Sequence, residues 1–440
     1  MAGHSLYLIP FQDKVLIYRP LRRILFLGNR ALADRAQLYC ESQDRSVLAD
    51  EPDVLYYFDS IGFTQPDPPE PEDPDLSIFQ PTAAALLMSN RCNLRCIYCY
   101  ANGGETNNLD LDPETAKRAV DTVCENAQKL NEEYFSVTFH GGGEPTLHWD
   151  AILELAEYSR KKPLPASLHI VTNGCWNEEQ GKRLIEYIDG MTISIDGAAE
   201  TQNAQRPMAG GKGSFDKVMR SVRQLSDAKF HYNFRMTVTP ERFKDLPDNV
   251  RFLCSETDCD QIQAEPAFYQ VRGAHGDIYS DQGKQFVSAF LEAYDIAAFY
   301  GKRLYYSGAR PTNITSLFCR APLGASLTVN PLGQVTGCYE TTGRDGQCGG
   351  VFGKADADGI YIDEEKRIAQ MSEILHRKDK CENCFCYYHC AGDCFTRGLP
   401  LENGEYPYTR CEINRSITLE LLLRQLSRSQ TLHSEEQTNE

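Results

Sequence analysis

Hydrophobic and polar stretches alternate along the middle of the chain with the rhythm of strands and helices. Six β-rich stretches stand out, at residues 83–89, 134–140, 167–174, 191–196, 230–239 and 260–268. Segments of helical length and composition separate them, at about 113–131, 149–161, 177–189, 214–227 and 245–256. This alternation predicts a parallel α/β sheet or barrel, a fold whose active sites lie at the carboxyl ends of the strands.

The regions on either side of this alternation are built differently. Residues 1–64 combine three short apolar stretches with one helical segment, which predicts a small α+β unit. Prolines and acidic residues then crowd at 65–75, where they forbid a regular ladder and leave little apolar surface to bury. Beyond about residue 310 cysteines gather and apolar periodicity fades, so we expect bound metal to replace a hydrophobic core there.

A helix from about Asn414 to Arg428 and a disordered polar tail are expected to end the chain. Together these patterns predict five segments: 1–64 (small α+β unit), 65–80 (acidic, proline-rich linker), 81–310 (barrel), 311–412 (cysteine-rich domain) and 413–440 (helix and tail).

Length, charge and cysteine content narrow the class of protein. The 440 residues agree with two or three domains. Asp and Glu number 62 against 45 Lys and Arg, and the net charge of −17 disfavours nucleic acid and acidic membrane surfaces as partners. No apolar run approaches the ~18 residues of a membrane span and no signal-peptide pattern opens the chain, so a cytoplasmic protein is expected. Its 17 cysteines are many for a reducing compartment, which favours metal ligation.

A first cysteine motif follows the first predicted strand. It reads Cys92-Asn-Leu-Arg-Cys96-Ile-Tyr-Cys99 and supplies three thiolates. A structural zinc site normally has four protein ligands, whereas a 4Fe-4S cube held by three thiolates exposes one iron to a small molecule. An incomplete zinc loop is the alternative interpretation.

Glycines and polar residues follow the next three strands. The strands end in Gly141-Gly142-Gly143-Glu144-Pro145, Thr172-Asn173-Gly174 and Ser194-Ile195-Asp196-Gly197. Glycines at the carboxyl end of a strand permit a ligand to approach the backbone closely, and polar groups from four consecutive strands emerge at one rim. Each segment alone is as typical of a tight turn as of a binding site, so their joint placement is the signal.

Through CxxxCxYC at 92–99, the GGE motif at 142–144 and the strand rhythm between 83 and 268, the sequence resembles the radical S-adenosylmethionine (SAM) superfamily. The resemblance implies a partial (β/α)6 TIM-type barrel in which Cys92, Cys96 and Cys99 bind a 4Fe-4S cluster. In that family SAM chelates the fourth iron, and an electron from the cluster cleaves it to methionine and a 5′-deoxyadenosyl radical that takes a hydrogen atom from the substrate. A donor such as flavodoxin or ferredoxin would supply the electron.

The same resemblance implies how SAM is held. Gly142, Gly143 and Glu144 would receive its methionyl amino group. Further cofactor contacts implied are Tyr98, Asn173, Ser194 and Asp196 for other polar atoms, and Arg206 for the carboxylate. A surface turn at Arg206-Pro207 is the alternative for that last assignment.

A second, denser series of cysteines fills the C-terminal part. Its order is Cys319, Gly333, Cys338, then Cys381-x2-Cys384-x5-Cys390-x3-Cys394, and finally Cys411. Zinc ribbons share the CxxC element, but the complete series resembles the SPASM extension of peptide-modifying radical enzymes. That family pattern implies two auxiliary 4Fe-4S clusters, three clusters in all. One would be held by Cys381, Cys384, Cys390 and Cys411, and the other by Cys319, Cys338 and Cys394.

The fourth ligand of the latter cluster is open. In sulfatase-maturing relatives it lies six residues ahead of the position of Cys319, where this chain has Asn313. Cys348 is the nearest replacement, and an open iron that could bind a substrate thiolate is the other possibility.

Six cysteines remain outside both series: Cys40, Cys124, Cys175, Cys254, Cys259 and Cys386. We interpret each as a small buried hydrophobic residue. A redox role or alternative ligation is the second interpretation for Cys175, beside the predicted rim, and for Cys386, inside the ligand-rich loop.

The SPASM resemblance implies a polypeptide substrate. By its order of elements, the unit at 1–64 resembles a degenerate form of the domain that captures leader peptides of ribosomally made, post-translationally modified peptides (RiPPs) as an added strand. An ordinary cap on the barrel is the alternative. The leading hypothesis is a maturase that abstracts a hydrogen atom from a precursor peptide and forms an intrapeptide cross-link, whether carbon-carbon, thioether or similar.

Two other functions are kept as alternatives. An anaerobic sulfatase-maturing enzyme would oxidise Cys or Ser to formylglycine, and that family places an Asp base directly after the residue matching Cys338. This chain has Tyr339 and then Glu340 there, a departure that disfavours this function. We interpret Glu340 as a solvated carboxylate, and a base is the alternative interpretation. A non-catalytic iron-sulfur electron carrier is the third hypothesis, disfavoured because a carrier has no use for an open iron beside GGE.

Overall fold

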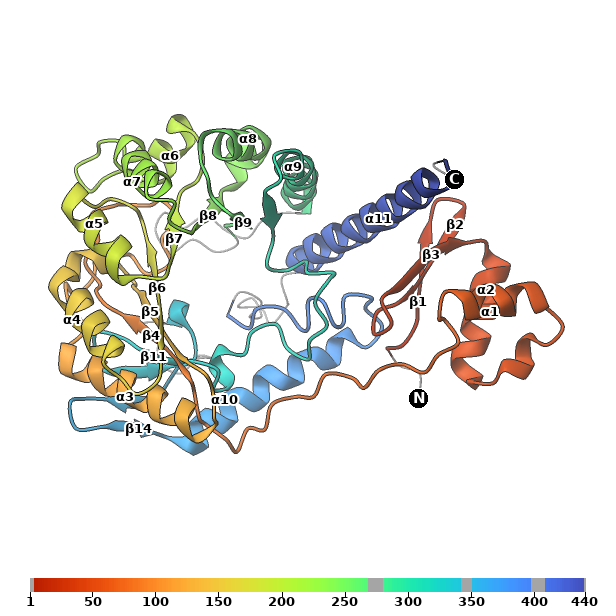
Figure 1. The fold of residues 1–440 in the computed structure, drawn as a ribbon, viewed down its shortest axis with the longest axis horizontal. Helices are drawn as coiled ribbons and strands as arrows, with labels where there is room; N and C mark the ends of the chain where they lie inside the picture. The colour runs from red at the N-terminus through yellow and green to blue at the C-terminus, as the bar shows by residue number, and fades with distance from the viewer. Residues whose placement is uncertain (1–3, 268–279, 342–349, 397–407, 439–440) are drawn as a thin grey trace.

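The central feature of the computed structural model, which describes residues 4–267, 280–341, 350–396 and 408–438, is an open barrel of parallel strands (Figure 1). The strands follow the order β10-β9-β8-β7-β6-β5-β4 around the wall. Their bounds are β4 (Ala83–Leu87), β5 (Phe135–His140), β6 (Ala166–Thr172), β7 (Gly190–Ser194), β8 (Tyr232–Val238), β9 (Gln261–Pro266) and β10 (Arg303–Tyr305). The predicted fold class, including its first six strands, is confirmed.

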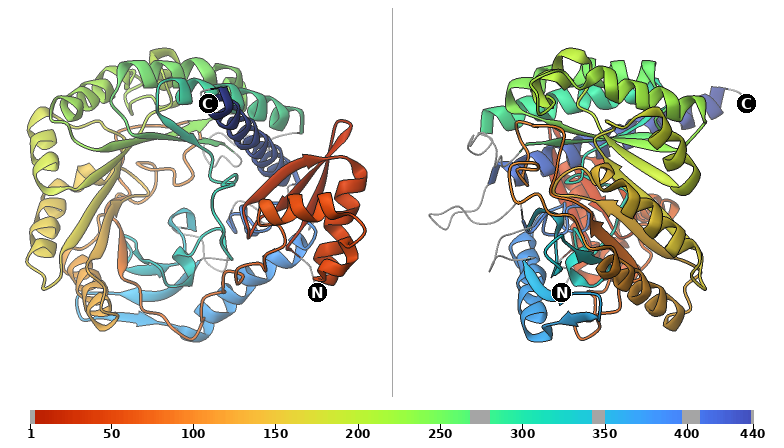
Figure 2. Two further views of the ribbon diagram at one scale, coloured as in Figure 1. Left: turned by 45° about the vertical axis from the view of Figure 1, so that its right-hand side comes forward. Right: turned by 90° about the vertical axis from the view of Figure 1, so that its left-hand side faces the viewer.

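Helices cover the outside of this wall, and the strands line the inside of the ring (Figure 2). They are α3 (Pro113–Lys129), α4 (Trp149–Arg160), α5 (Glu178–Tyr187), α6 (Ala199–Gln205), α7 (Phe215–Asp227), α8 (Leu246–Glu256) and α9 (Ser280–Phe299). The five predicted helices are present, and α6, α9 and the short β10 are additions. The start of α3 shows the local cause, because Asp112 accepts a hydrogen bond from Thr115 N at 2.9 Å ahead of Pro113.

Alternation along β8 divides its side chains between the core and the barrel interior. Phe234 and Met236 are 1% exposed and pack in the main core beneath the helices. Arg235 and Thr237 therefore leave the sheet on the opposite face, toward the interior, because successive strand side chains point to opposite faces.

The cysteine-rich C-terminal part continues the barrel sheet. Its first strand, β11 (Leu327–Val329), pairs in parallel with β4 and is followed by an antiparallel run of three strands. These strands are β12 (Gln334–Thr336), β13 (Val351–Ala355) and β14 (Ile360–Ile362), with α10 (Glu364–His376) after them. Leu327, Val335 and Phe352 lie in the main core, so the expectation that this region lacks a hydrophobic core is wrong for its β-strands.

The N-terminal unit is a separate antiparallel sheet in the order β1-β2-β3. It contains β1 (Tyr7–Phe11), β2 (Lys14–Arg19), β3 (Ile24–Gly28), α1 (Arg30–Ser42) and α2 (Pro52–Ser60). One face of the sheet packs on the two helices. The other face, with Tyr7 and Tyr18, packs on Phe385 and Cys386 of the C-terminal cysteine loop and on Leu422.

The linker has no helix or strand at 65–80, as predicted, but it is held along its length. Arg19 forms an ion pair with Asp67 at 2.7 Å. Further along, Ser316 donates to the carbonyl of Glu72 at 3.0 Å, and Arg367 donates to the carbonyl of Leu76 at 2.6 Å. The N-terminal unit is therefore docked on the C-terminal part rather than loosely tethered to it.

The last helix corrects the expected end of the chain. α11 spans Tyr408–Thr438, so the expected disordered tail is helical nearly to its end. Its segment ITLELLL packs apolar residues such as Ile417 and Leu421 into the main core. None of the helices in the described ranges is both long enough and apolar enough to cross a membrane.

Candidate functional site

The three cysteines of the first motif lie on the loop that follows β4 at the carboxyl rim of the barrel. All three are partly exposed. Leu94 N donates to Cys92 Sγ at 3.4 Å, and Gly103 N donates to Cys99 Sγ at 3.5 Å. Backbone donors of this kind tune the sulfurs of iron-sulfur clusters. Among the described residues, no three His, Cys, Asp or Glu side chains are arranged to hold a metal ion.

The glycine turn after β5 is in close backbone contact with this loop. Glu144 N donates to the carbonyl of Arg91 at 2.7 Å. A Cβ added to Gly143 would lie 2.0 Å from that same carbonyl oxygen, and one added to Gly103 would lie 2.7 Å from the carbonyl oxygen of Gly142. The glycines of the motif thus let the turn and the cysteine loop touch backbone to backbone.

Glu144 ties the ends of β5 and β6 together. It is 1% exposed; its Oε1 accepts from Thr172 Oγ1 at 2.6 Å and from the hydroxyl and amide of Thr146 at 2.7 and 3.2 Å. Its Oε2 accepts from Asn173 N at 2.7 Å. Burial raises the pKa of Glu144, and these donors oppose that shift. Since a carboxylate has about four acceptor sites, two on each oxygen, Oε2 keeps room for one further donor, such as an amino group.

Asn173 braces the cysteine loop from the next strand end. Its Nδ2 donates to Asn93 Oδ1 at 2.8 Å and lies 4.0 Å from Cys92 Sγ, while its Oδ1 accepts from Cys175 N at 2.9 Å. The structure therefore brings together the first cysteine, the GGE turn and the end of β6.

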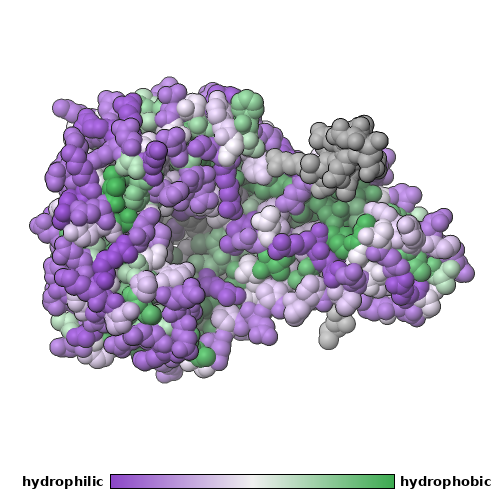
Figure 3. Space-filling view, viewed as in Figure 1, coloured by the Kyte–Doolittle hydropathy of each residue, from purple (hydrophilic) through white to green (hydrophobic). Residues whose placement is uncertain are grey.

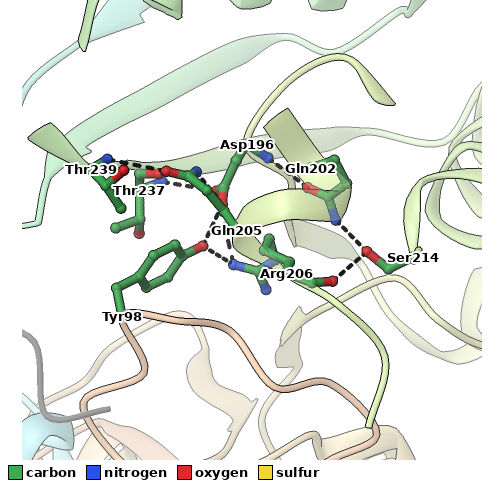
Figure 4. A network of polar contacts seen from close by, with 8 residues as sticks. All are labelled: Tyr98, Asp196, Gln202, Gln205, Arg206, Ser214, Thr237 and Thr239. Carbon is green, nitrogen blue, oxygen red and sulfur yellow. Dashed lines mark hydrogen bonds and ion pairs between the residues drawn. The ribbon is translucent and has the colours of Figure 1, made fainter. Parts of the chain in front are cut away.

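A buried polar network joins Asp196 to the cysteine motif (Figure 4). Tyr98 donates its hydroxyl proton to Asp196 Oδ2 at 2.6 Å and accepts from Arg206 Nη1 at 2.6 Å. Gln205 Nε2 donates to Asp196 Oδ2 at 2.8 Å, and Thr237 N donates to Asp196 Oδ1 at 3.0 Å. Burial raises the pKa of Asp196, and the nearby guanidinium opposes the shift. The network fixes the loop between Cys96 and Cys99 to β7 and β8.

Arg206 belongs to this network and not to a surface turn. It is 8% exposed, and its Nε is buried without a hydrogen-bond partner among the described residues. A buried guanidinium N–H without an acceptor suits an anionic ligand, so Arg206 fits the carboxylate of SAM. Ser194, at the end of β7, is partly buried and in register with Arg235.

Three cysteines of the second series come together on the C-terminal part. The hydroxyl of Thr396 lies 4.0 Å from Cys338 Sγ and 3.2 Å from Cys394 Sγ. Burial, then Glu340 and Cys394, raise the pKa of Cys338, and Cys319 adds a smaller effect in the same direction. Cys348 lies outside the described residues. At position 313, the backbone carbonyl oxygen of Asn313 lies within hydrogen-bond distance of His389 Nδ1, at 2.8 Å.

The other four cysteines form a second group. Cys384 N donates to the carbonyl of Cys381 at 2.9 Å, and burial followed by Cys384 and Cys411 raises the pKa of Cys381 to about 11. Asn414 Nδ2 donates to Cys390 Sγ at 3.3 Å. Cys386, 2% exposed, hydrogen-bonds with Cys384 and packs on the N-terminal sheet.

The four other unassigned cysteines that are buried (Cys40, Cys124, Cys254 and Cys259) lie in hydrophobic cores, as interpreted from the sequence. Cys175 is partly exposed beside the rim and packs against the main core. Sequence reasoning missed the polar side chains of the barrel interior, Arg235, Gln263 and Tyr305. The alternation Phe-Arg-Met-Thr within 230–239 is the signal that could have revealed the first of them.

The fold and the rim define the class of protein. Residues 86–253 match the model of the radical SAM superfamily, so the chain carries a radical SAM domain. Domains of this family use SAM and a 4Fe-4S cluster, and the residues above fit both groups.

Individual relatives and solved structures are similar to longer stretches of the chain. It is 29% identical over 211 residues, 47% of this chain and 49% of the relative, to Fe-coproporphyrin III synthase of Methanosarcina barkeri. It is 23% identical over 338 residues, 71% of this chain and 67% of the relative, to the radical SAM cyclopropyl synthase TigE of Paramaledivibacter caminithermalis. The chain spans about half the length of the first curated relatives it matches. Native anSMEcpe with bound AdoMet and the Cp18Cys peptide superposes with a TM-score of 0.62 at 18% identity, covering 80% of this chain and 99% of that one.

Proposed function

We propose that this chain is a radical SAM enzyme that removes a hydrogen atom from a ribosomally made precursor peptide and forms an intrapeptide cross-link. When bound, SAM and its cluster would supply the one-electron chemistry needed to attack an unactivated carbon. Cys92, Cys96 and Cys99 would hold that cluster, and the glycine turn and the Asp196 network would orient SAM.

The observation that carries the proposal is that Tyr100 lies close to both of the cysteine groups nearest the barrel. Tyr100, next to Cys99, has its pKa raised by burial and then by Glu340, Cys99 and Cys338. His140, at the end of β5, packs its ring against Tyr339 with centroids 4.9 Å apart. A substrate between these groups would touch the site of hydrogen abstraction and an auxiliary cluster, which could accept the second electron when the new bond forms.

Two auxiliary 4Fe-4S clusters complete the proposal. Cys381, Cys384, Cys390 and Cys411 form one ligand set. Cys319, Cys338 and Cys394 form the other, with Cys348 or an open site in fourth place. The structure of anSMEcpe with the Cp18Cys peptide supports a peptide substrate. The match to TigE extends over most of this chain, whereas the match to Fe-coproporphyrin III synthase is limited to about half of it.

The N-terminal unit would capture a leader segment of the precursor. One face of its sheet is buried by α1 and α2 and the other by the C-terminal cysteine loop. A peptide strand would therefore have to pair with an edge of this sheet. β1 contains Pro10, which has no N–H to donate and so disfavours pairing at that edge, whereas β3 contains no proline. We therefore assign the leader strand to the edge of β3, with main-chain pairing as the source of affinity.

Anaerobic reconstitution tests the enzymatic proposal. The reduced protein should convert SAM to 5′-deoxyadenosine, and the combined variant C92A/C96A/C99A should not, while its auxiliary clusters keep their iron. C124A, in the buried core, is the matched control for loss of a thiol. Cleavage of SAM by the triple variant would contradict the proposal, because the first motif would then not hold the catalytic cluster.

A specific observation keeps formylglycine formation as the second candidate. Glu340 lies near Tyr100 and His140, and its amide donates to Cys338 Sγ at 3.4 Å, so its carboxylate is close to the position that the base of that reaction would need. Products separate the two functions, since a cross-linked peptide loses two hydrogens without gaining an aldehyde. We would treat the product with a hydrazide reagent and read the mass; a hydrazone would favour formylglycine and contradict the cross-link.

A further inference from the structure

A polar row crosses the barrel interior, beginning at Ser194, the innermost of the expected SAM contacts. Ser194 on β7 is in register with Arg235 on β8, Arg235 with Gln263 on β9, and Gln263 with Tyr305 on β10. Arg235 points to the interior because its neighbour Phe234 is buried under the helices. The space-filling view shows the molecule hollowed at its middle, over the open centre of the ribbon in Figure 1 (Figure 3).

Arg235 is positioned by a neutral partner. Its Nη1 donates to Gln263 Oε1 at 3.3 Å, and Tyr305 donates to the same oxygen at 3.3 Å. Gln263 Nε2 in turn donates to Glu265 Oε1 at 2.9 Å, which also accepts from Ser307 N at 2.9 Å. Within the described part of the chain no carboxylate forms an ion pair with Arg235. A guanidinium has five N–H donors, so most of those of Arg235 remain for a ligand.

The positive charge of Arg235 affects the pKa values of ionisable groups on other strands of the barrel. Burial first, and then Arg235, lowers the pKa of His140 on β5 to about 4. Arg235 also opposes the rise in the pKa of Tyr305 that burial causes. Glu265 and Glu340 are the opposite charges nearest to these two groups. Arg235 is partly buried and its hydrogen-bond partner is a neutral amide, so an anionic ligand would supply the charge partner that it lacks among the described residues.

The Asp196 network lies nearer the rim than this cation, whereas Ser194, another expected cofactor contact, is level with it. Thr237, whose amide donates to Asp196, lies two residues nearer the rim on the same strand, a rise of about 6.6 Å. Arg206 already stands beside the cysteine motif to meet the carboxylate of SAM. Arg235 therefore lies one layer deeper than the Asp196 network, beside Ser194 and inside the barrel.

We infer that Arg235 is a specificity-determining residue that binds a carboxylate of the substrate, either an Asp or Glu side chain or a C-terminal carboxylate, close to the position that reacts. This inference rests on the proposed function, since it names the chemical class of peptide that the same site would accept. Gln263 and Tyr305 are positioning residues that hold the guanidinium in place.

Three short peptides test the inference and distinguish the two sources of the carboxylate. The probes are acetyl-Gly-Asp-Gly-amide, acetyl-Gly-Asn-Gly with a free C-terminal carboxylate, and the neutral acetyl-Gly-Asn-Gly-amide. Their dissociation constants would be measured by NMR titration of the oxidised, reconstituted holoenzyme with SAM present. We expect at least one acidic probe to bind about tenfold or more tightly than the neutral one, because hydrogen bonds to charged groups are the strong class.

Variants assign that preference to the residue. R235Q should remove the preference and R235K should keep part of it, whereas R223Q, which removes an exposed cation on helix α7, should leave it unchanged. The visible absorbance of the clusters shows whether each variant is folded and loaded. Equal affinities for the three probes, no measurable binding of the acidic ones, or the same preference in R235Q would overturn the inference. Failure of the wild type to form 5′-deoxyadenosine would instead remove the proposed function.

Discussion

Replacing Gly143 by Ala should dismantle the first cluster site. The added Cβ would stand 2.0 Å from the carbonyl oxygen of Arg91 and 2.7 Å from the carbonyl carbons of Arg91 and Asn90. These atoms belong to the backbone of the two residues that immediately precede Cys92. Restoring an ordinary contact of 3.4 Å would shift the backbone by about 1.4 Å, since no side chain is there to rotate away.

Arg91 has little freedom to make that shift. Its side chain forms an ion pair with Asp110 at 2.6 Å and donates to the carbonyl of Leu147 at 2.8 Å, while its carbonyl accepts from Glu144 N at 2.7 Å. Overpacking of this kind costs about 1–3 kcal/mol of folding free energy. Displacement of a catalytic group by ~1 Å costs about a hundredfold in rate.

We therefore expect G143A to bind less iron at the first site and to form 5′-deoxyadenosine at about 1% of the wild-type rate or less. Iron analysis, cluster absorbance and chromatography of the nucleoside would measure this. G210A is the matched control, because a Cβ there meets nothing within 4 Å. If G143A kept its full iron content and rate, the close backbone contact would not be required for the site.

Three further predictions follow from the same geometry. The reconstituted chain should contain about 12 iron atoms, three cubes of four, and convergence on four would remove both auxiliary clusters. Tyr18→Phe removes the hydroxyl 2.5 Å from the Nε2 of the buried His389; it should cost about 1–3 kcal/mol and loosen the N-terminal unit in limited proteolysis. Tyr39→Phe, which loses a bond inside that unit, should not loosen it, and equal cleavage of the two variants would contradict the docking role. Thr172→Val should weaken SAM binding measured by equilibrium dialysis, because Glu144 loses one donor; unchanged affinity would show that this bond does not position the turn.

The barrel strands were predictable because local patterns determine them. The stretch predicted at 134–140 is β5, Phe135–His140, and its end is marked by the glycines that the cysteine loop requires. β11, in contrast, has three residues and exists through pairing with β4, more than two hundred residues earlier. A contact so distant in sequence leaves no periodic signal in either segment.

The residues of the candidate site also fall into two groups, those that local sequence motifs predict and those that depend on tertiary structure. Motif spacing placed Cys92, Gly143 and Glu144 at one rim, since each follows the end of a strand. The partners of Glu144 on β6, and the row that contains Arg235, depend on the register between strands, which hydrophobic periodicity does not specify. The docking of Tyr18 on the C-terminal loop likewise depends on tertiary packing alone.

Docking of the N-terminal unit changes how leader capture has to be tested. Deleting residues 1–64 would expose Phe385 and Cys386, which pack on the sheet beside Cys384 and Cys390, two of the proposed cluster ligands. Loss of peptide binding after deletion would then have two causes, a missing edge and a damaged cluster. Side-chain substitution in β3 has the same defect, because the sheet is buried on both faces.

Changing the ligand avoids this difficulty. If a leader adds to β3 as a fourth strand, its N–H groups alternate between pairing with β3 and pointing away, with a period of two residues. N-methylation of single leader residues should therefore weaken binding at every second position, by about 1 kcal/mol or roughly fivefold per lost bond, and leave the positions between nearly unchanged. The probe would be a peptide encoded next to this chain's gene, labelled for fluorescence anisotropy with the intact holoenzyme. Uniform sensitivity, or none, would reject strand addition and leave residues 1–64 as a cap that supports the auxiliary cluster.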